Sequence, residues 1–253
     1  MLLDRYVLGP AGGNSGRGRA HIAFTDRHGG YSEDPYDFNL ARHVGDQETA
    51  VAQNRALLAQ ALGATPESFV FLRQVHGARV VLADDALLDS DELTSPLREA
   101  DAVVTARSDL RLVVLTADCA PVLLADPAAG VIGAAHAGRP GMLTGVVPAT
   151  LAAMRELGAD QIEAVIGPTV CPRCYEVPAA MRDEAAGIEP VCASVTWEGT
   201  PAIDVAGGVA EQLARHGVAL RWSRHCTVED AALFSHRREG TTGRQAAVVW
   251  LEH

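Results

Sequence analysis

The sequence predicts an α+β fold. Short β-rich runs and amphipathic helical segments mix along the chain without the regular strand–helix–strand repeat of a doubly wound sheet. The 253 residues are 48% hydrophobic and 21% charged, which supports a sizeable core and excludes a disordered or collagen-like chain. No shift in composition marks a boundary, so we expect a single domain over residues 1–253.

The first half of the chain is predicted to be mainly strands. An early strand pair, 5–8 and 21–24, is joined by a glycine-rich segment that we expect to be a mobile connection. A helix is predicted from Asp46, as its cap, to Leu62, with Gly63 ending it. The remaining β-rich runs are 69–81, expected to be a strand pair interrupted at His76-Gly77, and 102–105, 112–116, 122–125 and 131–135.

After Gly141 the apolar residues recur with the period of a helix. One amphipathic helix is predicted over 142–157, with a late start or a kink at Pro148. The other elements expected here are helices at 178–186 and 205–216 and strands at 162–166, 220–223 and 245–251.

Charge excludes several classes of function. The net charge of −11 argues against nucleic-acid and anionic-membrane partners, which require a positive surface. The chain has no lysine, so Schiff-base catalysis, a covalent pyridoxal phosphate link and a Walker A lysine are excluded. Any phosphate chemistry must therefore use arginine, backbone amides or a metal.

The chain is expected to be cytoplasmic. Its longest apolar stretch, 112–125, is interrupted by Asp118 and Pro121 and is too short to cross a bilayer. The start, with Asp4, lacks the basic region and apolar run of a signal peptide. Five cysteines in such a chain favour metal or thiolate chemistry over a disulfide framework.

Three side chains with metal-binding chemistry follow apolar strands. Cys119, His136 and His76 fit a zinc site with a position left open for water, which characterises a catalytic zinc. Spacing alone favours a plainer interpretation, in which a buried cysteine and two hydrogen-bonded loop histidines bind no metal. A further alternative is a metal-free thiolate nucleophile, with His136 as its base and Asp118 or Asp101 orienting it.

Two other motifs have weaker signals. Cys171 and Cys174 form a CxxC, for which Cys192, Cys226 or His225 would have to complete a structural zinc site. Because no second CxxC is present, ordinary thiols are the favoured interpretation.

The second motif is rich in arginine. Arg237, Arg238 and Arg244, with glycines between them, suit a phosphate-binding segment, and Arg27 beside Gly29 is a further candidate anion contact. The alternative is a solvated basic hairpin before the last strand.

Many segments in order make the chain similar to a known family. The segments are TDRHGGYS (25–32), FNLARHVGD (38–46), RQVHG (73–77), EADAVVT (99–105), TADCAPVLLAD (116–126), AAHAG (134–138), IGP (166–168), CYEV (174–177) and FSHRREGTTGRQAAVVWL (234–251). Together they resemble the YfiH-like laccase-domain family, also called the multicopper polyphenol oxidase or purine nucleoside phosphorylase family. The resemblance implies a four-layer α/β/β/α domain with mixed sheets.

The resemblance also implies a site and an activity. It makes His76, Cys119 and His136 zinc ligands, and we expect them to be the catalytic residues. The arginines selected above by their chemistry, Arg27, Arg237, Arg238 and Arg244, are expected to bind substrate. The implied activity is phosphorolysis of adenosine, inosine, guanosine and methylthioadenosine, together with adenosine deamination. The partners are therefore a purine nucleoside and phosphate, and the cofactor is Zn²⁺, with Cu²⁺ as the alternative.

Other activities remain open. The resemblance includes copper-dependent polyphenol oxidases, although nine scattered histidines without an HxH pair suit a multicopper centre poorly. A metal-free Cys/His hydrolase editing peptidoglycan precursors and a non-catalytic protein with a structural zinc are further alternatives. The chain departs from the family pattern at one place: Arg139-Pro140 stand where the family usually has Trp-Arg, which would alter specificity or activity if those family residues contact the substrate.

Overall fold

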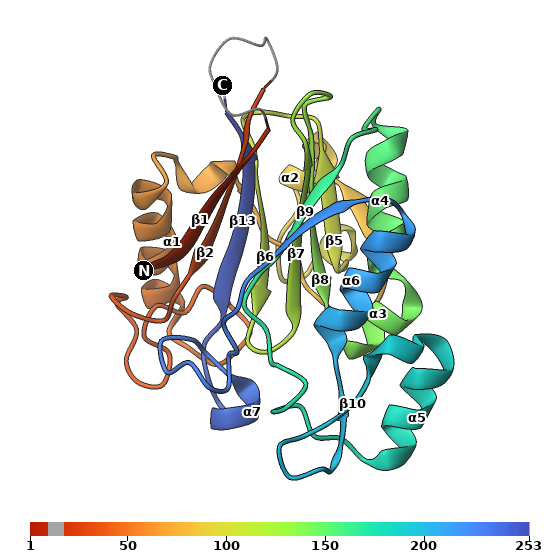
Figure 1. The fold of residues 1–253 in the computed structure, drawn as a ribbon. Helices are drawn as coiled ribbons and strands as arrows, with labels where there is room; N and C mark the ends of the chain where they lie inside the picture. The colour runs from red at the N-terminus through yellow and green to blue at the C-terminus, as the bar shows by residue number, and fades with distance from the viewer. Residues whose placement is uncertain (10–17, 253) are drawn as a thin grey trace.

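Two β-sheets pack face to face, and helices cover the outer face of each (Figure 1). The computed structural model describes residues 1–9 and 18–252. This arrangement confirms the expected four layers and the α+β class. The expected mobile connection includes residues 10–17, which lie outside the described residues.

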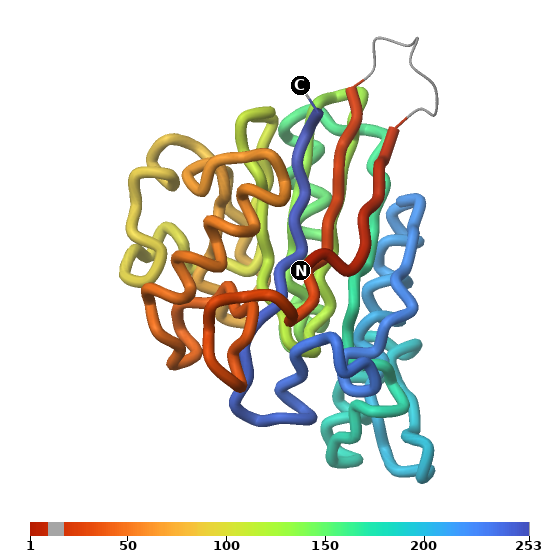
Figure 2. Tube along the Cα trace, turned by 90° about the vertical axis from the view of Figure 1, so that its left-hand side faces the viewer, coloured from red at the N-terminus to blue at the C-terminus, as the bar shows by residue number. Residues whose placement is uncertain are grey.

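The first sheet has five strands, whose order is β1, β2, β13, β6, β3. Figure 2 shows β1, β2 and β13 side by side in this sheet. Its pairings are antiparallel except for β3, which runs parallel to β6. The strands are β1 (Leu2–Leu8), β2 (Ala20–Thr25), β13 (Gln245–Leu251), β6 (Arg111–Thr116) and β3 (Phe69–Val70).

The second sheet has six strands, whose order is β12, β9, β7, β8, β5, β4. It is antiparallel in the centre and parallel at both edges. The strands are β12 (Ala219–Trp222), β9 (Glu163–Ile166), β7 (Ala120–Asp126), β8 (Val131–Ala137), β5 (Ala102–Thr105) and β4 (Val80–Leu82). A separate antiparallel pair is formed by β10 (Ala193–Val195) and β11 (Pro201–Ile203).

Three apolar cores hold the layers together. Between the sheets, buried side chains such as Phe24, Leu112, Leu123 and Ile132 interdigitate. Helix α1 (Glu48–Ala61) packs on the five-stranded sheet. The helices on the six-stranded sheet are α3 (Arg139–Thr144), α4 (Val146–Glu156), α5 (Ala179–Ile188) and α6 (Val205–Arg215). The short helices are α2 (Asp85–Leu88), α7 (His236–Glu239) and the 3-10 turns Pro66–Ser68, Pro96–Arg98 and Pro190–Cys192.

Three expectations about these elements were wrong in detail. Gln47, not Asp46, is the cap of α1, because the Asp46 carboxylate accepts hydrogen bonds from Ser32 and Asn39 instead. The segment 69–81 is not a strand pair, since β3 and β4 belong to different sheets. The helix expected over 142–157 is two helices, separated at Gly145, whose φ of 87° is left-handed.

Two connections between the sheets leave the same end of the first sheet, because β3 and β6 run parallel, and they position the functional residues. The connection from β3 to β4 crosses from the first sheet to the second, and so does the connection from β6 to β7. His76 lies on the first crossing and Cys119 on the second. Among the described residues, no helix is both long and apolar enough to span a membrane.

At the other end of β7, a buried carboxylate fixes two loops. Asp126 accepts hydrogen bonds from the backbone N–H groups of Ala128, Ala129, Asp160 and Gln161, at 2.8 to 3.0 Å. Burial alone would raise the pKa of Asp126, but these donors lower it below its ordinary value.

We expect Asp126→Asn to lower the free energy of unfolding by about 1–3 kcal/mol, because an amide group cannot accept all four bonds. The depressed pKa means that the carboxylate stabilises the fold above its ordinary pKa of about 3.9 and loses this effect as the pH falls further. Urea denaturation at about pH 7 and about pH 3 tests both statements, since the difference between wild type and variant should shrink in acid. A constant difference would contradict them.

Candidate metal centre and adjoining cavity

The ligand atoms of His76, Cys119 and His136 all lie within 4.8 Å of one another. His136 is the penultimate residue of β8, and its ring lies beside the two residues on the crossings between the sheets. Ligands held tetrahedrally by zinc at about 2.0–2.3 Å are separated by about 3.3–3.8 Å, so small side-chain shifts would complete coordination. The imidazole–thiolate donor set is one that zinc prefers.

A single buried carboxylate organises this cluster. Asp101 is fully buried and accepts backbone N–H bonds from Val75, His76 and Gly77 at 3.2, 2.8 and 2.7 Å. Its Oδ1 also lies 2.8 Å from Nδ1 of His136. The bond to the carboxylate places the imidazole proton on Nδ1, which leaves Nε2 as the metal ligand. Asp101 therefore fixes both the His76 loop and the tautomer of His136.

The charges of Cys119 and His136 support each other. Burial opposes ionisation of Cys119, but His136 and His76 bring the pKa of its thiol down to about 6. Burial likewise disfavours a charged His136, but the Cys119 thiolate and Asp101 raise its pKa to about 9. The thiolate, which is the form that binds metals, is thus present at neutral pH. A cation bound here would displace the proton on Nε2 of His136, while Nδ1 keeps its proton for Asp101.

Tight backbone geometry brings the three side chains together. His76 has a φ of 62°, a left-handed conformation that non-glycine residues adopt at an energetic cost. Gly138 lies against the cluster, because a Cβ placed there would meet Cδ2 of His76 at 2.8 Å and Sγ of Cys119 at 3.1 Å. The absence of a side chain at residue 138 is therefore required for the cluster to close.

The cluster lies in the wall of a cavity of about 380 Å³. This volume falls within the range of small-molecule sites, about 300–1,000 Å³. The lining is formed by His43, Gln74, His76, Leu115, Thr116, Ala117, Asp118, Cys119, His136, Arg139, Val170, Tyr175, Val205, His236, Arg237 and Arg244. One cavity therefore adjoins both the metal-type cluster and three arginines.

The four arginines expected to bind substrate occupy two kinds of position. Arg237 and Arg244 line the cavity, and the Arg237 guanidinium lies 5.1 Å from the centre of the Tyr175 ring. Arg27 lies outside the lining and forms ion pairs with Asp37 at 2.9 Å and Glu239 at 2.5 Å.

Arg238 also lies outside the lining. It donates hydrogen bonds to the carbonyls of Thr227, Val228, Asp230 and Leu233, at 2.5 to 3.1 Å. The structure thus brings two of the four arginines to the cavity and gives the other two internal partners.

Asp118 anchors the segment that carries Cys119 by hydrogen bonds to other loops. Of the two acids weighed as orienting groups, Asp101 contacts His136, whereas Asp118 accepts bonds from Thr227 and Ser235 at 2.6 and 2.7 Å. Its other oxygen accepts the backbone N–H of Arg237 at 2.6 Å. Asp118 has a φ of 102°, so this network maintains a strained backbone next to Cys119.

Several cavity residues were not predicted individually. His43, Tyr175 and His236 all line the cavity, and each lies in a segment that carried the resemblance. Burial lowers the pKa of His43, and nearby Arg244 lowers it further, so its imidazole is neutral at pH 7. The segments that resemble the family contain all three residues. A histidine or tyrosine at these positions has no distinctive chemistry in the sequence, so nothing singled them out.

The chain is similar to known proteins over nearly its whole length. Residues 21–252 match the family described as multi-copper polyphenol oxidoreductase laccase. The chain belongs to this laccase family. The resemblance inferred from the motifs is thereby confirmed.

Relatives of this laccase-family chain cover nearly its whole length. A purine nucleoside phosphorylase of Streptomyces coelicolor is 54% identical over 237 residues, covering 92% of this chain and 96% of the relative. A purine nucleoside phosphorylase of Mycobacterium tuberculosis is 47% identical over 232 residues, covering 90% of each chain. The solved YfiH structure of Bacillus licheniformis superposes with a TM-score of 0.83 at 28% identity, covering 94% of this chain and 98% of that one.

We expect Gly138→Ala to weaken zinc binding by at least about tenfold, because the added methyl group would push His76 and Cys119 apart. Gly187→Ala is the matched control, since a Cβ at that helical glycine meets no atom within 4 Å. Competition for zinc with a chromogenic chelator measures both affinities. Equal affinities of the two variants would show that close packing at Gly138 does not position the ligands.

Proposed function

We propose that this chain is a zinc-dependent purine nucleoside phosphorylase that also deaminates adenosine. The observation that carries the proposal is one cavity in which a Cys/His/His cluster faces Arg237 and Arg244. The relatives named purine nucleoside phosphorylase support it.

His76, Cys119 and His136 would hold the zinc ion. The donor set and the closeness of Gly138 fit such an ion. When bound, zinc supplies Lewis acidity and lowers the pKa of coordinated water. Asp101 keeps His136 in the tautomer that presents Nε2, and the exposed side chain of His76 leaves the cluster accessible to water and substrate from the cavity.

Arg237 and Arg244 provide the binding site for phosphate. In phosphorolysis a phosphate oxygen attacks C1′ of the ribose while the bond from C1′ to the purine nitrogen breaks, and the released base takes up a proton. Guanidinium groups hold phosphate through paired N–H donors and stay charged when partly buried, as Arg244 is. They place the nucleophile against the sugar and stabilise charge in the transition state.

Arg27 and Arg238 assist indirectly in this proposal. Arg27 binds Glu239 of α7, the short helix that carries Arg237, and Arg238, itself in α7, donates to the carbonyls of Thr227 and Leu233. They therefore hold α7 against the cavity instead of contacting the substrate.

Arg139 adds a third cation despite the altered motif. It begins α3, followed by Pro140, a residue well suited to the first turn of a helix. Its position in the cavity lining lets it contact the same anion as Arg237 and Arg244. His43, with a neutral imidazole, offers one donor and one acceptor to the purine edge.

Phenol oxidation is the weaker candidate. A trinuclear copper centre needs many histidines, and within residues 1–9 and 18–252 the cluster of His76, Cys119 and His136 is the one metal-type grouping that contains histidine. Elemental analysis of protein produced without added copper discriminates the two metals.

Turnover of adenosine, inosine, guanosine and methylthioadenosine, with and without phosphate, tests the activity. We expect free base and a ribose 1-phosphate product only with phosphate, and inosine from adenosine without it. Arg244→Ala should lower kcat/KM for phosphorolysis by about 100-fold, since it removes a transition-state contact. Deamination, which uses no phosphate, should change much less.

Arg182→Ala is the control for loss of an arginine, because Arg182 pairs with its neighbour Asp183 on α5, outside the cavity lining. Release of free base at the same rate with and without phosphate would overturn the phosphorylase assignment. Full activity of a zinc-free His136→Ala variant would overturn the metal's role.

A further inference from the structure

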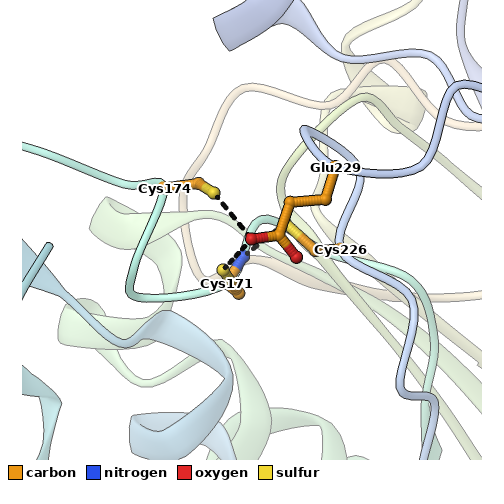
Figure 3. Close-up of side chains that lie close together, drawn as sticks. All are labelled: Cys171, Cys174, Cys226 and Glu229. Carbon is orange, nitrogen blue, oxygen red and sulfur yellow. Dashed lines mark hydrogen bonds between the residues drawn. The ribbon is translucent and has the colours of Figure 1, made fainter. Parts of the chain in front are cut away.

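A second group of metal-type ligands lies outside the cavity lining. The ligand atoms of Cys171, Cys174, Cys226 and Glu229 are all within 4.8 Å of one another. Figure 3 shows the two CxxC thiols turned toward the Glu229 carboxylate, with Cys226 beside them. The Cys174 sulfur lies 3.4 Å from Oε1 of Glu229, and the Cys171 sulfur lies 4.0 Å from it.

The backbone holds these four residues in two adjacent turns. Cys171 and Cys174 close a turn in which the Cys174 N–H donates to the Cys171 carbonyl at 3.0 Å. Cys226 and Glu229 lie in a second turn, closed by the Asp230 N–H donating to the Cys226 carbonyl at 2.9 Å. A parallel bridge between Thr169 and Cys226 extends the pairing of β9 with β12 and aligns the turns.

One backbone group is already aimed at a ligand sulfur. The N–H of Cys171 donates to Sγ of Cys226 at 3.3 Å. Outer contacts of this kind orient metal ligands and stabilise the charge on a thiolate.

We propose that Cys171, Cys174, Cys226 and Glu229 hold a structural zinc ion. Three thiolates and one carboxylate give the four ligands of a closed tetrahedral site, and soft sulfur donors select zinc over magnesium or calcium. The site carries no histidine and no open position, which distinguishes it from the cluster at the cavity. Of the ligands weighed from the sequence, Cys226 joins the CxxC, Cys192 is buried in the core under the helices, and His225 lies 2.7 Å from the Asp230 carboxylate instead. Glu229 was not predicted as a ligand.

A zinc ion here would cross-link two turns that lie next to residues of the cavity lining. The first turn leads directly to Tyr175, which packs against Arg237, and it follows Val170, whose N–H donates to the Asp118 carbonyl at 2.9 Å. The second turn contains Thr227, which donates to the Asp118 carboxylate at 2.6 Å. Cross-linking the turns therefore fixes the supports of Asp118 and Tyr175 relative to each other.

Metal content per chain tests the proposal on the whole protein. With zinc supplied during expression, we expect two zinc ions in the wild type and one in Cys171→Ser/Cys174→Ser. Cys192→Ser, which removes a buried thiol outside both clusters, should keep two. His76→Ala/His136→Ala should keep one, so this result is independent of the proposed enzymatic activity. No zinc in His76→Ala/His136→Ala, or two zinc ions in the CxxC variant, would overturn the proposal.

A spectroscopic test does not depend on stoichiometry. Cobalt(II) loaded into His76→Ala/Cys119→Ala should retain sulfur-to-cobalt charge-transfer absorption and the visible bands of a tetrahedral site. Because Glu229 is exposed, the Glu229→Gln variant should fold normally, and it should bind cobalt at least tenfold more weakly. Glu198→Gln, at another exposed position, should leave cobalt affinity unchanged. Loss of the charge-transfer band in the first variant, or a disulfide among the three cysteines in the intact mass of freshly purified protein, would contradict the site.

Discussion

The hydrogen bonds of one buried carboxylate determine whether this site can exist. Asp101 binds three consecutive N–H groups of the His76 loop and the Nδ1 of His136. An ionised carboxylate with no exposure is tolerated because these four donors replace water, and they lower its pKa against the effect of burial. The same bonds maintain the left-handed backbone of His76. Without Asp101, both histidine ligands would lose their fixed orientation.

The two metal-type clusters are supported by one framework. Cys119 follows Asp118 at the crossing from β6 to β7. Asp118 accepts hydrogen bonds from Thr227 and Arg237, which lie in the loop between β12 and β13. The cysteine–glutamate cluster joins that loop to the segment after β9. The proposed zinc ligands, the arginines proposed to bind phosphate and the proposed structural ion therefore lie at one end of the sandwich. Hydrogen bonds to Asp118 connect loops that form much of the lining of the cavity.

The sequence predicted local features well and long-range ones poorly. Strands 102–105 and 245–251 were predicted with their observed bounds, because turn residues flank each apolar run. The sheets to which 69–70 and 80–82 belong could not be predicted, since a strand pattern does not identify its partner. Chemistry singled out Cys119 and the histidines, and the motifs in order identified the family. Glu229 is an ordinary surface acid in the sequence, and only the fold brings it to the cysteines.

Zinc affinity of Asp101→Asn tests the central claim most directly. An amide that accepts the backbone bonds of the His76 loop would present its NH₂ group to Nδ1 of His136, which moves the imidazole proton to Nε2 and blocks ligation. We expect affinity at the His76–Cys119–His136 cluster to fall by about 10- to 100-fold. Asp126→Asn, which removes a comparable buried carboxylate at the far end of β7, should leave that affinity unchanged. Wild-type affinity in a folded Asp101→Asn protein would contradict the account.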